Sequence, residues 1–154
     1  QLEGFTDIEA GSYIFMDLRY GGTAGVDFQQ SLTVLSTIVS HPKPDLWVCD
    51  AGLKSMTKEF GLVSILPSHG IKPAHMSEEH ITLEPNLDPE RLPSLTELDR
   101  KYAQTGPKKL TVGDKIHLVP SHCCTTVNLH DVIYAVRNGV VEDVWAVTGR
   151  GKFA

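Results

Sequence analysis

DVIYAVRNGVVEDVWAV, residues 131–147, predicts a β-hairpin. Two runs rich in β-branched and aromatic residues flank the pair Asn138-Gly139. Asn-Gly between such runs is the preferred filling of a two-residue type I′ turn. The pattern therefore places a turn at Asn138 and Gly139 and indicates a rigid sheet near the end of the chain.

The segment before the hairpin, VPSHCCTTVNLHD at 119–131, holds the densest set of metal-binding side chains in the sequence. These are His122, Cys123, Cys124 and His130. A strand-like run, KIHLV at 115–119, leads into the segment. Pro120 then removes a backbone donor and bars a regular continuation of the strand. We therefore expect the cluster where a strand exits onto a loop, an arrangement on which sites of chemistry are often built.

Short strands separated by turns predict a mainly β chain. Besides the hairpin, the predicted strands cover residues 12–17, 31–40, 45–50, 76–84 and 115–119. The run 31–40 is β-branched throughout and alternates along its length, which is a strand pattern. Turns are predicted at 41–44 and 112–114. Residues 53–73 are predicted to be irregular with one helical turn at 53–59, and 86–106 to be a solvated loop with a short helix at 94–103. Short strands punctuated by turns suggest a barrel or a sandwich.

The composition is that of one soluble globular domain. The chain has 154 residues, of which 41% are hydrophobic and 21% charged, enough for a single core. A formal net charge of −5 without a basic stripe argues against nucleic acid and anionic membrane as partners. No run approaches the length of a transmembrane helix, and the acidic N-terminus, which lacks an initiator Met, has no signal-peptide pattern. Three cysteines, two of them adjacent, predict a reducing, cytoplasmic compartment with thiols free or on metal.

His122 and Cys124 are the candidate metal ligands. In an extended segment, positions i and i+2 face the same way, and imidazole nitrogen and thiolate sulfur are both good Zn²⁺ ligands. Cys123 would then point away and act as a small core residue. Two ligands cannot close a structural zinc site, so water or substrate would complete an open shell of the kind a catalytic metal needs. The alternative is a buried Cys pair beside a surface His without metal, and the spacing alone favours that alternative.

Other polar groups have structural explanations. Asp50 and Lys54 flank Ala51-Gly52, where a carboxylate caps a turn more often than it orients a ligand. Glu78, Glu79 and His80 could add metal ligands, but the solvated face of the strand at 76–84 is the favoured interpretation. Tyr13, Tyr20 and Tyr134 are expected to be ordinary core or rim aromatics.

Six motifs spread along the chain carry a resemblance to a known family. They are EAGSYIFMD at 9–17, CDAGLK at 49–54, SEEH at 77–80, VGD at 112–114, VPSHCCTTVNLHD at 119–131 and VTGRGK at 147–152. In this order they resemble the D-serine dehydratase and D-threonine aldolase family, and the motif at 119–131 resembles the metal motif of that family. The six motifs cover nearly the whole chain, which makes the resemblance specific.

The resemblance implies the C-terminal β-domain of an alanine racemase-like enzyme of fold type III. Family members join an N-terminal α/β barrel, which holds pyridoxal phosphate on a Lys, to such a β-domain. We expect residues 1–27 to be the linking strand and loop, and 28–154 to be the metal-binding domain. The barrel is expected to lie outside this chain. None of the lysines here is therefore assigned to the cofactor, and the fragment alone is expected to be inactive.

The resemblance also implies that His122 and Cys124 hold Zn²⁺, or else Mn²⁺ or Mg²⁺, which binds the β-hydroxyl of a D-3-hydroxy amino acid. We therefore predict part of a lyase, and the His-x-Cys pattern places D-serine dehydratase ahead of D-threonine aldolase. A homodimer is expected, because a β-domain without its barrel exposes apolar surface of the kind that marks interfaces. The rival hypothesis is a stand-alone β-module that binds metal or a partner without catalysis.

Overall fold

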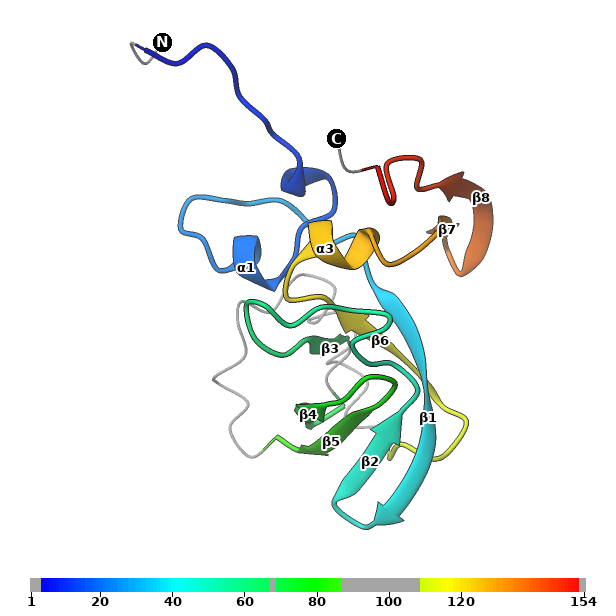
Figure 1. The fold of residues 1–154 in the computed structure, drawn as a ribbon. Helices are drawn as coiled ribbons and strands as arrows, with labels where there is room; N and C mark the ends of the chain where they lie inside the picture. Colours follow the sequence, from blue (N-terminus) through cyan, green and yellow to red (C-terminus); the bar gives the residue numbers. More distant parts are fainter. Residues whose placement is uncertain (1–3, 67–68, 87–108, 153–154) are drawn as a thin grey trace.

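The computed structural model describes residues 4–66, 69–86 and 109–152, and most of its regular structure is strand (Figure 1). In chain order the elements are the 3-10 helix η1 (Ser12–Ile14), α1 (Leu18–Gly21), β1 (Val34–Lys43), β2 (Leu46–Cys49), β3 (Ser64–Leu66), β4 (Ile71–Met76), β5 (Ile81–Pro85), β6 (Lys115–Val119), α3 (Cys123–Val127), β7 (Val132–Arg137) and β8 (Val140–Ala146). No helix within the described ranges is long and apolar enough to cross a membrane. The mainly β class predicted from the sequence is confirmed.

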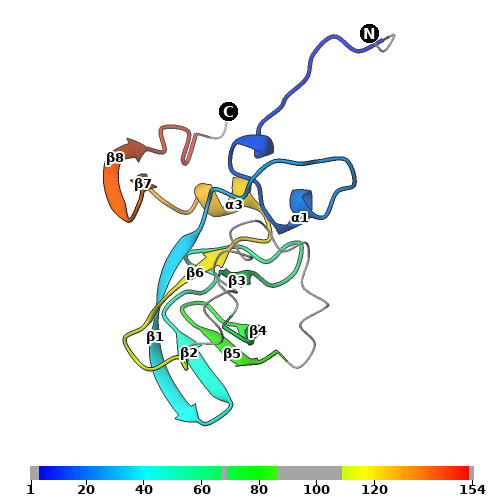
Figure 2. The same ribbon diagram turned by 180° about the vertical axis from the view of Figure 1, so that it is seen from behind.

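Six of the strands form one antiparallel sheet that curls toward a barrel. The strand order is β3-β6-β1-β2-β5-β4, and every pairing in it is antiparallel. The edge strands β3 and β4 also contact each other, so the sheet is nearly closed (Figures 1 and 2). Closure leaves few unpaired edge groups. Strand β6, which leads into the His/Cys cluster, pairs with β3 on one side and β1 on the other. The strand that precedes the cluster is therefore hydrogen-bonded along both edges.

Aliphatic side chains fill the interior of the sheet. In β5 the inward residues Ile81 and Leu83 are fully buried, while Thr82 between them is partly exposed, as the period of two in a strand requires. The other large side chains that are wholly buried include Ile38, Met56, Ile116 and Leu118. Trp47 packs against this core, and its indole N–H donates to the Leu110 carbonyl at 3.2 Å. Each such aliphatic side chain contributes roughly 1.5–3 kcal/mol of burial free energy.

Strands β7 and β8 form the hairpin predicted around Asn138-Gly139. The two turn residues have φ values of 51° and 79°, the positive values that a type I′ turn requires. The hairpin is a two-stranded sheet of its own, and every residue of β8 is exposed. An isolated two-stranded hairpin is marginally stable in water. This hairpin would therefore gain stability from a covering surface.

The strand predicted at 12–17 is wrong. Ser12–Ile14 forms a 3-10 turn instead, and the Met16 N–H closes a wider turn onto the Ser12 carbonyl at 2.7 Å. Met16 has a φ of 55°, outside the range of strands, and Asp17 follows as the N-cap of α1. Both Met16 and Asp17 are 2% exposed. Burying both side chains requires the backbone to turn at Met16 and Asp17. This requirement overrides the strand propensity of residues 12–17.

The strand predicted at 76–84 is correct only in its second half, because the run holds the last residue of β4, a turn at 77–80 and most of β5. The strands β4 and β5 meet at a turn in which the Ser77 N–H donates to the His80 carbonyl at 2.9 Å. Glu78 and His80 therefore lie in a turn rather than on a strand face. In this turn, the backbone carbonyls of Ser77 and Glu78 accept hydrogen bonds from the N–H groups of Leu53 and Lys54.

Other boundaries follow the prediction more closely. Strand β6 matches the run at 115–119, and β1 and β2 overlap those at 31–40 and 45–50. The turn predicted at 41–44 is wrong, because β1 continues to Lys43 through a register shift that accommodates Pro42. The stretch 53–73, predicted as irregular, contains β3 and the start of β4. The short helix predicted within 86–106 lies outside the described residues.

Candidate metal centre

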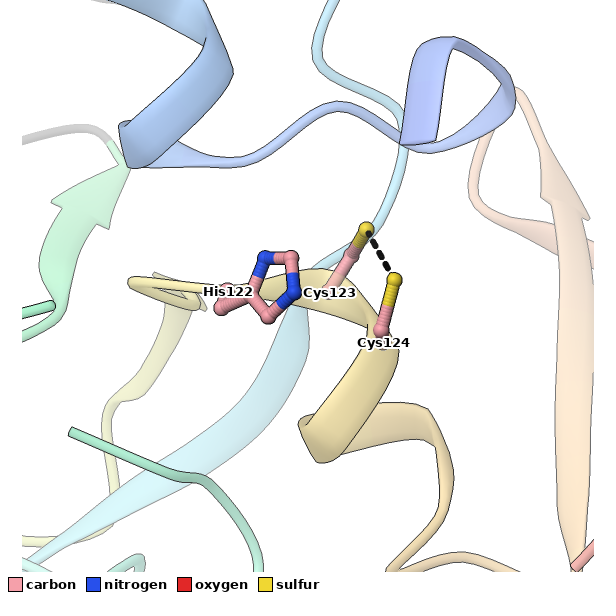
Figure 3. A group of neighbouring side chains, drawn as sticks. All are labelled: His122, Cys123 and Cys124. Carbon is pink, nitrogen blue, oxygen red and sulfur yellow. Dashed lines mark hydrogen bonds between the residues drawn. The ribbon is translucent and has the colours of Figure 1, made fainter. Parts of the chain in front are cut away.

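His122, Cys123 and Cys124 lie together at the start of α3 (Figure 3). Strand β6 ends before Pro120, and His122 takes the N-cap position of α3 with extended backbone angles, φ −143° and ψ 129°. A candidate ligand atom of each of the three residues lies within 4.8 Å of the other two. Within the described part of the chain this is the only group of three or more His, Cys, Asp or Glu residues with that geometry.

The three side chains come together by a different route from the predicted one. The sequence argument places His122 and Cys124 on one face of an extended segment, but Cys123–Val127 is helical. Cys123 is buried, as expected of a small core residue, yet it does not point away from the group. Its Sγ lies 4.0 Å from the Cys124 Sγ (Figure 3). Two sulfurs on one tetrahedral zinc, each at about 2.3 Å, would be separated by about 3.8 Å.

The two cysteines have different surroundings. Cys123 is 1% exposed, whereas Cys124 is open to solvent and lies 3.8 Å from the Ser12 hydroxyl. Burial, with the Asp17 carboxylate and the Cys124 sulfur beside it, raises the pKa of Cys123 to about 12. Cys123 therefore remains a thiol at neutral pH. Cys124 is the sulfur that an ion arriving from solvent would meet.

Asp17 is the site residue that the sequence reasoning missed. Its Oδ2 accepts from the Cys123 N–H at 2.8 Å and lies 2.9 Å from His122 Nδ1, and its Oδ1 accepts from the Tyr20 N–H at 2.9 Å. Burial of the carboxylate would raise its pKa, but the hydrogen bonds from Tyr20, Cys123 and His122 outweigh burial and lower the pKa below 3.8. The available signal was Asp17 itself, ahead of the Leu-Arg-Tyr run at 18–20, because Asp is a preferred N-cap residue.

Backbone contacts hold the Asp17 segment against the cluster. The N–H groups of Leu18 and Arg19 donate to the carbonyls of Pro120 and Ser121, each at 3.2 Å. In both ribbon views η1 and α1 lie beside α3 (Figures 1 and 2). The beginning and the last third of the described chain therefore build this centre together.

Aromatic rings surround the His122 imidazole. The Phe60 ring meets it edge-on at 5.3 Å between centroids, and the Tyr20 ring lies at 6.0 Å. The Arg19 guanidinium sits 5.1 Å from the centre of the Phe60 ring, a cation–π contact. Tyr20, expected as an ordinary core or rim aromatic, is thus a neighbour of the cluster. These contacts restrict rotation of the imidazole.

Hydroxyl groups tie α3 to the segment at 57–60. The Thr57 and Thr125 hydroxyls lie 2.8 Å apart, and the Ser121 hydroxyl donates to the Thr57 carbonyl at 3.1 Å. The Thr125 hydroxyl also donates to the Glu59 carboxylate. Burial opposes ionisation of Glu59, but the hydrogen bonds from Thr125 and Thr57 outweigh burial and lower its pKa. The start of α3 is therefore held from two sides.

The remaining candidates serve the fold. His130 Nε2 lies 2.8 Å from the Ser55 carbonyl, a contact that fixes the loop after α3. Asp50 accepts from the Ser36 hydroxyl and the Thr37 N–H at 2.8 and 2.6 Å, so it ties β2 to β1. Lys54 pairs with Glu79 at 2.5 Å on the surface.

The donor set at this centre suits a divalent cation of the zinc type. Imidazole nitrogen and thiolate sulfur both favour zinc over magnesium or calcium, which prefer oxygen. Cys124 is exposed, His122 is partly buried, and the buried Cys123 sulfur lies beside them. Such a site leaves coordination positions open, and an open position is what allows a metal to polarise a bound oxygen.

The middle of the chain matches a known protein family. Residues 31–136 match the family model described as "Putative serine dehydratase domain". The chain belongs to this family. The resemblance drawn from the six motifs is thereby confirmed at the level of the family.

Known members are similar over nearly the whole chain. It is 38% identical to the D-threonine aldolase of Arthrobacter sp. and 35% identical to the 3-hydroxy-D-aspartate aldolase of Paracoccus denitrificans, over 96% of its own length in each case. The chain spans only 35% of the length of each of these relatives.

Solved structures show the same fold. The D-threonine aldolase of Filomicrobium marinum superposes with a TM-score of 0.71 at 30% identity, over 92% of this chain and 35% of that one. A cysteine-to-alanine variant of D-threo-3-hydroxyaspartate dehydratase in the metal-free form superposes with a TM-score of 0.63 at 21% identity, over 95% of this chain and 40% of that one. The described chain therefore has the fold of about a third of these enzymes.

Proposed function

We propose that this chain is the metal-binding β-domain of a lyase that acts on D-3-hydroxy amino acids. The observation that carries the proposal is the convergence of His122, Cys123 and Cys124 within 4.8 Å at the start of α3, in a chain of the serine dehydratase domain family. Zinc is the first candidate ion because of the nitrogen and sulfur donors, with Mn²⁺ and Mg²⁺ as alternatives. When bound, the cation would polarise the substrate β-hydroxyl.

His122 and Cys124 are proposed as the ligands, with Cys123 outside the ligand set. Cys124 is exposed, whereas Cys123 is buried with its pKa raised to about 12. Ligation requires the thiolate, and forming it on Cys123 would place a second negative charge against the Asp17 carboxylate. The Cys123 sulfur instead fills space beneath the site.

The relatives support this choice of substrate class and ligands. D-Threonine and 3-hydroxy-D-aspartate, the substrates in the names of the two similar aldolases, are both D-amino acids with a hydroxyl on the β-carbon. In D-threo-3-hydroxyaspartate dehydratase, the solved alanine variants replace a histidine and a cysteine two positions later, and the cysteine variant is in the metal-free form. His122 and Cys124 have the same spacing.

Dehydratase is the first candidate reaction and aldolase the second. The thiolate ligand and the His-x-Cys spacing favour a dehydratase, in which the cation would help hydroxide leave. Identities of 38% and 35% to two aldolases favour the second candidate, in which a base would take the hydroxyl proton, the Cα–Cβ bond would break and the hydroxyl oxygen would become the carbonyl oxygen of the product aldehyde. Products formed from D-threonine by the full native polypeptide distinguish the two, since a dehydratase releases ammonia and a 2-oxo acid and an aldolase releases glycine.

Pyridoxal phosphate enters the proposal through the family resemblance. Among the lysines of the described structure, Lys54 and Lys72 pair with Glu79 and Glu84 on the surface, with side chains 69% and 48% exposed. We therefore propose that the cofactor is held by the part of such enzymes that this chain does not match. The role of this chain's residues is to hold the cation and the substrate hydroxyl next to it.

Metal content of matched cysteine variants tests the proposal. Wild type, Cys124→Ser and Cys123→Ser are loaded with Zn²⁺, dialysed and measured by atomic emission. We expect Cys124→Ser to lose most of its zinc and Cys123→Ser, which changes the adjacent sulfur, to keep it. In wild type and Cys123→Ser, Co²⁺ should also show the charge-transfer absorption of one thiolate. Equal zinc content in wild type and Cys124→Ser would refute the ligand assignment.

A further inference from the structure

Asp17 makes contacts that reach beyond those of a helix cap. Its side chain has no exposed surface, and one carboxylate oxygen, Oδ2, serves both the His122 ring and the Cys123 N–H, at 2.9 and 2.8 Å. The other oxygen accepts from the Tyr20 N–H at 2.9 Å. The carboxylate thus joins two segments separated by 105 residues at the point where the proposed ligands begin.

This contact determines where the proton of a neutral His122 ring resides. An ionised carboxylate has only acceptors, so the ring nitrogen facing it, Nδ1, must carry the hydrogen. The lone pair then belongs to Nε2. Figure 3 shows one ring nitrogen of His122 on the side of the cysteines and the other turned away from them. With Nδ1 held by Asp17, Nε2 is the nitrogen left to face the sulfurs.

We propose that Asp17 is a positioning residue that holds His122 as the Nδ1–H tautomer and thereby presents Nε2 to the cation. This inference rests on the proposed metal-binding function. A metal-ligating histidine that donates its other N–H to a carboxylate is a general arrangement, and loss of such a partner typically weakens metal binding by 10–100-fold. Because the same carboxylate also accepts from the Cys123 N–H, it places the backbone between the two proposed ligands as well.

Asp17→Asn is the informative substitution, since it keeps the size of the side chain but replaces one acceptor by an NH₂ donor. If the amide nitrogen faces His122, it also meets the Cys123 N–H, whose hydrogen bond is lost. The His122 ring must then offer a lone pair at Nδ1 and carry its hydrogen on Nε2, where the cation would bind. If the amide nitrogen faces Tyr20, the N-cap of α1 is lost instead. We expect the first arrangement in a sizeable share of molecules, with zinc affinity reduced by about 10–100-fold.

Asp50→Asn is the matched control. Asp50 also accepts a backbone N–H and a side-chain donor, but from Thr37 and Ser36 in the sheet. Its replacement should cost stability of a similar kind without changing the His122 ring. A purely structural role of Asp17 would therefore give the two variants the same behaviour.

The tautomer is measured directly by long-range ¹H–¹⁵N correlation spectra of the His122 ring in metal-free protein at alkaline pH. We expect Nδ1–H in wild type and in Asp50→Asn, and a rise of Nε2–H in Asp17→Asn with a parallel loss of Zn²⁺ affinity by competition titration. Nε2–H in wild type would overturn the inference even if Asp17→Asn failed to fold. Unchanged tautomer and affinity in a folded Asp17→Asn protein whose Tyr20 amide keeps its protection from hydrogen exchange, and whose amide nitrogen therefore faces His122, would also overturn it, while leaving the ligand assignment intact. Nδ1–H in a wild-type protein that binds no zinc would instead overturn the proposed function, and with it the role toward a cation.

Discussion

Gly52 packs so tightly against a neighbouring turn that alanine should not fit there. A Cβ on Gly52 would lie 2.5 Å from the Ser77 carbonyl oxygen and 2.6 Å from the carbonyl carbon and oxygen of Glu78. These are backbone atoms, which cannot swing aside as a flexible side chain can. Gly52→Ala must therefore push the turn between β4 and β5 away from the segment at 52–54.

The expected cost follows from the hydrogen bonds that this displacement breaks. The N–H groups of Leu53 and Lys54 donate to the Ser77 and Glu78 carbonyls, both at 2.9 Å. At a net 0.5–1.5 kcal/mol each, the two bonds stabilise the protein by about 1–3 kcal/mol. Replacing Gly by Ala returns about 0.4–1 kcal/mol by restricting the unfolded chain. We therefore expect a net loss in the free energy of unfolding of up to about 2.6 kcal/mol, with a central value of about 1.3 kcal/mol.

Urea denaturation followed by circular dichroism measures this loss. Gly149→Ala is the matched control, because a Cβ there meets no atom within 4 Å. It should leave the unfolding free energy unchanged or slightly raised. Gly52→Ala with the same midpoint and slope as Gly149→Ala would show that the turn yields without cost, and would refute the argument from close packing.

Two further predictions concern charge and surface. Burial opposes ionisation of Asp50, but hydrogen bonds from Thr37 and Ser36 outweigh burial and lower its pKa below the ordinary 3.8 in the folded protein. The ionised Asp50 side chain therefore stabilises the protein fully above pH 3.8, and this stabilisation is lost as pH falls through the lower folded-state pKa. Urea midpoints of wild type and Asp50→Asn should accordingly differ at neutral pH and converge in acid, and a constant difference would contradict the shift. Trp145 and Val136 on the hairpin are 51% and 61% exposed, and such apolar surface favours association. Sedimentation velocity should therefore show self-association of the wild-type protein. The double substitution Trp145→Ser with Val136→Thr should weaken that association. A wild-type monomer at high concentration would count against the predicted dimer.

Local chemistry accounts for the parts of the fold that were predicted correctly. Asn138 and Gly139 adopt positive φ values because few other pairs do so at low cost, and that preference is visible in two letters of sequence. The end of β6 at Pro120 is equally local, since proline lacks the N–H that a central strand needs. The family resemblance was also readable from the sequence, because its motifs stand in order along the chain.

The arrangement of the metal centre depends on contacts that no local pattern contains. The run at 12–17 has strand-like side chains, yet the Asp17 side chain points inward. It is held there by hydrogen bonds to His122 and Cys123, which lie 105 and 106 residues further along the chain. The helical start of α3 likewise brings Cys123 and Cys124 to the same side, against the alternation expected of an extended segment. The turn, the mainly β class and the candidate pair His122 and Cys124 could all be predicted without the structure. Asp17 faces the imidazole only after β1, which follows α1, has paired with β6, which leads into α3, because a hydrogen bond between distant segments depends on how the whole chain folds back and not on the residues beside it.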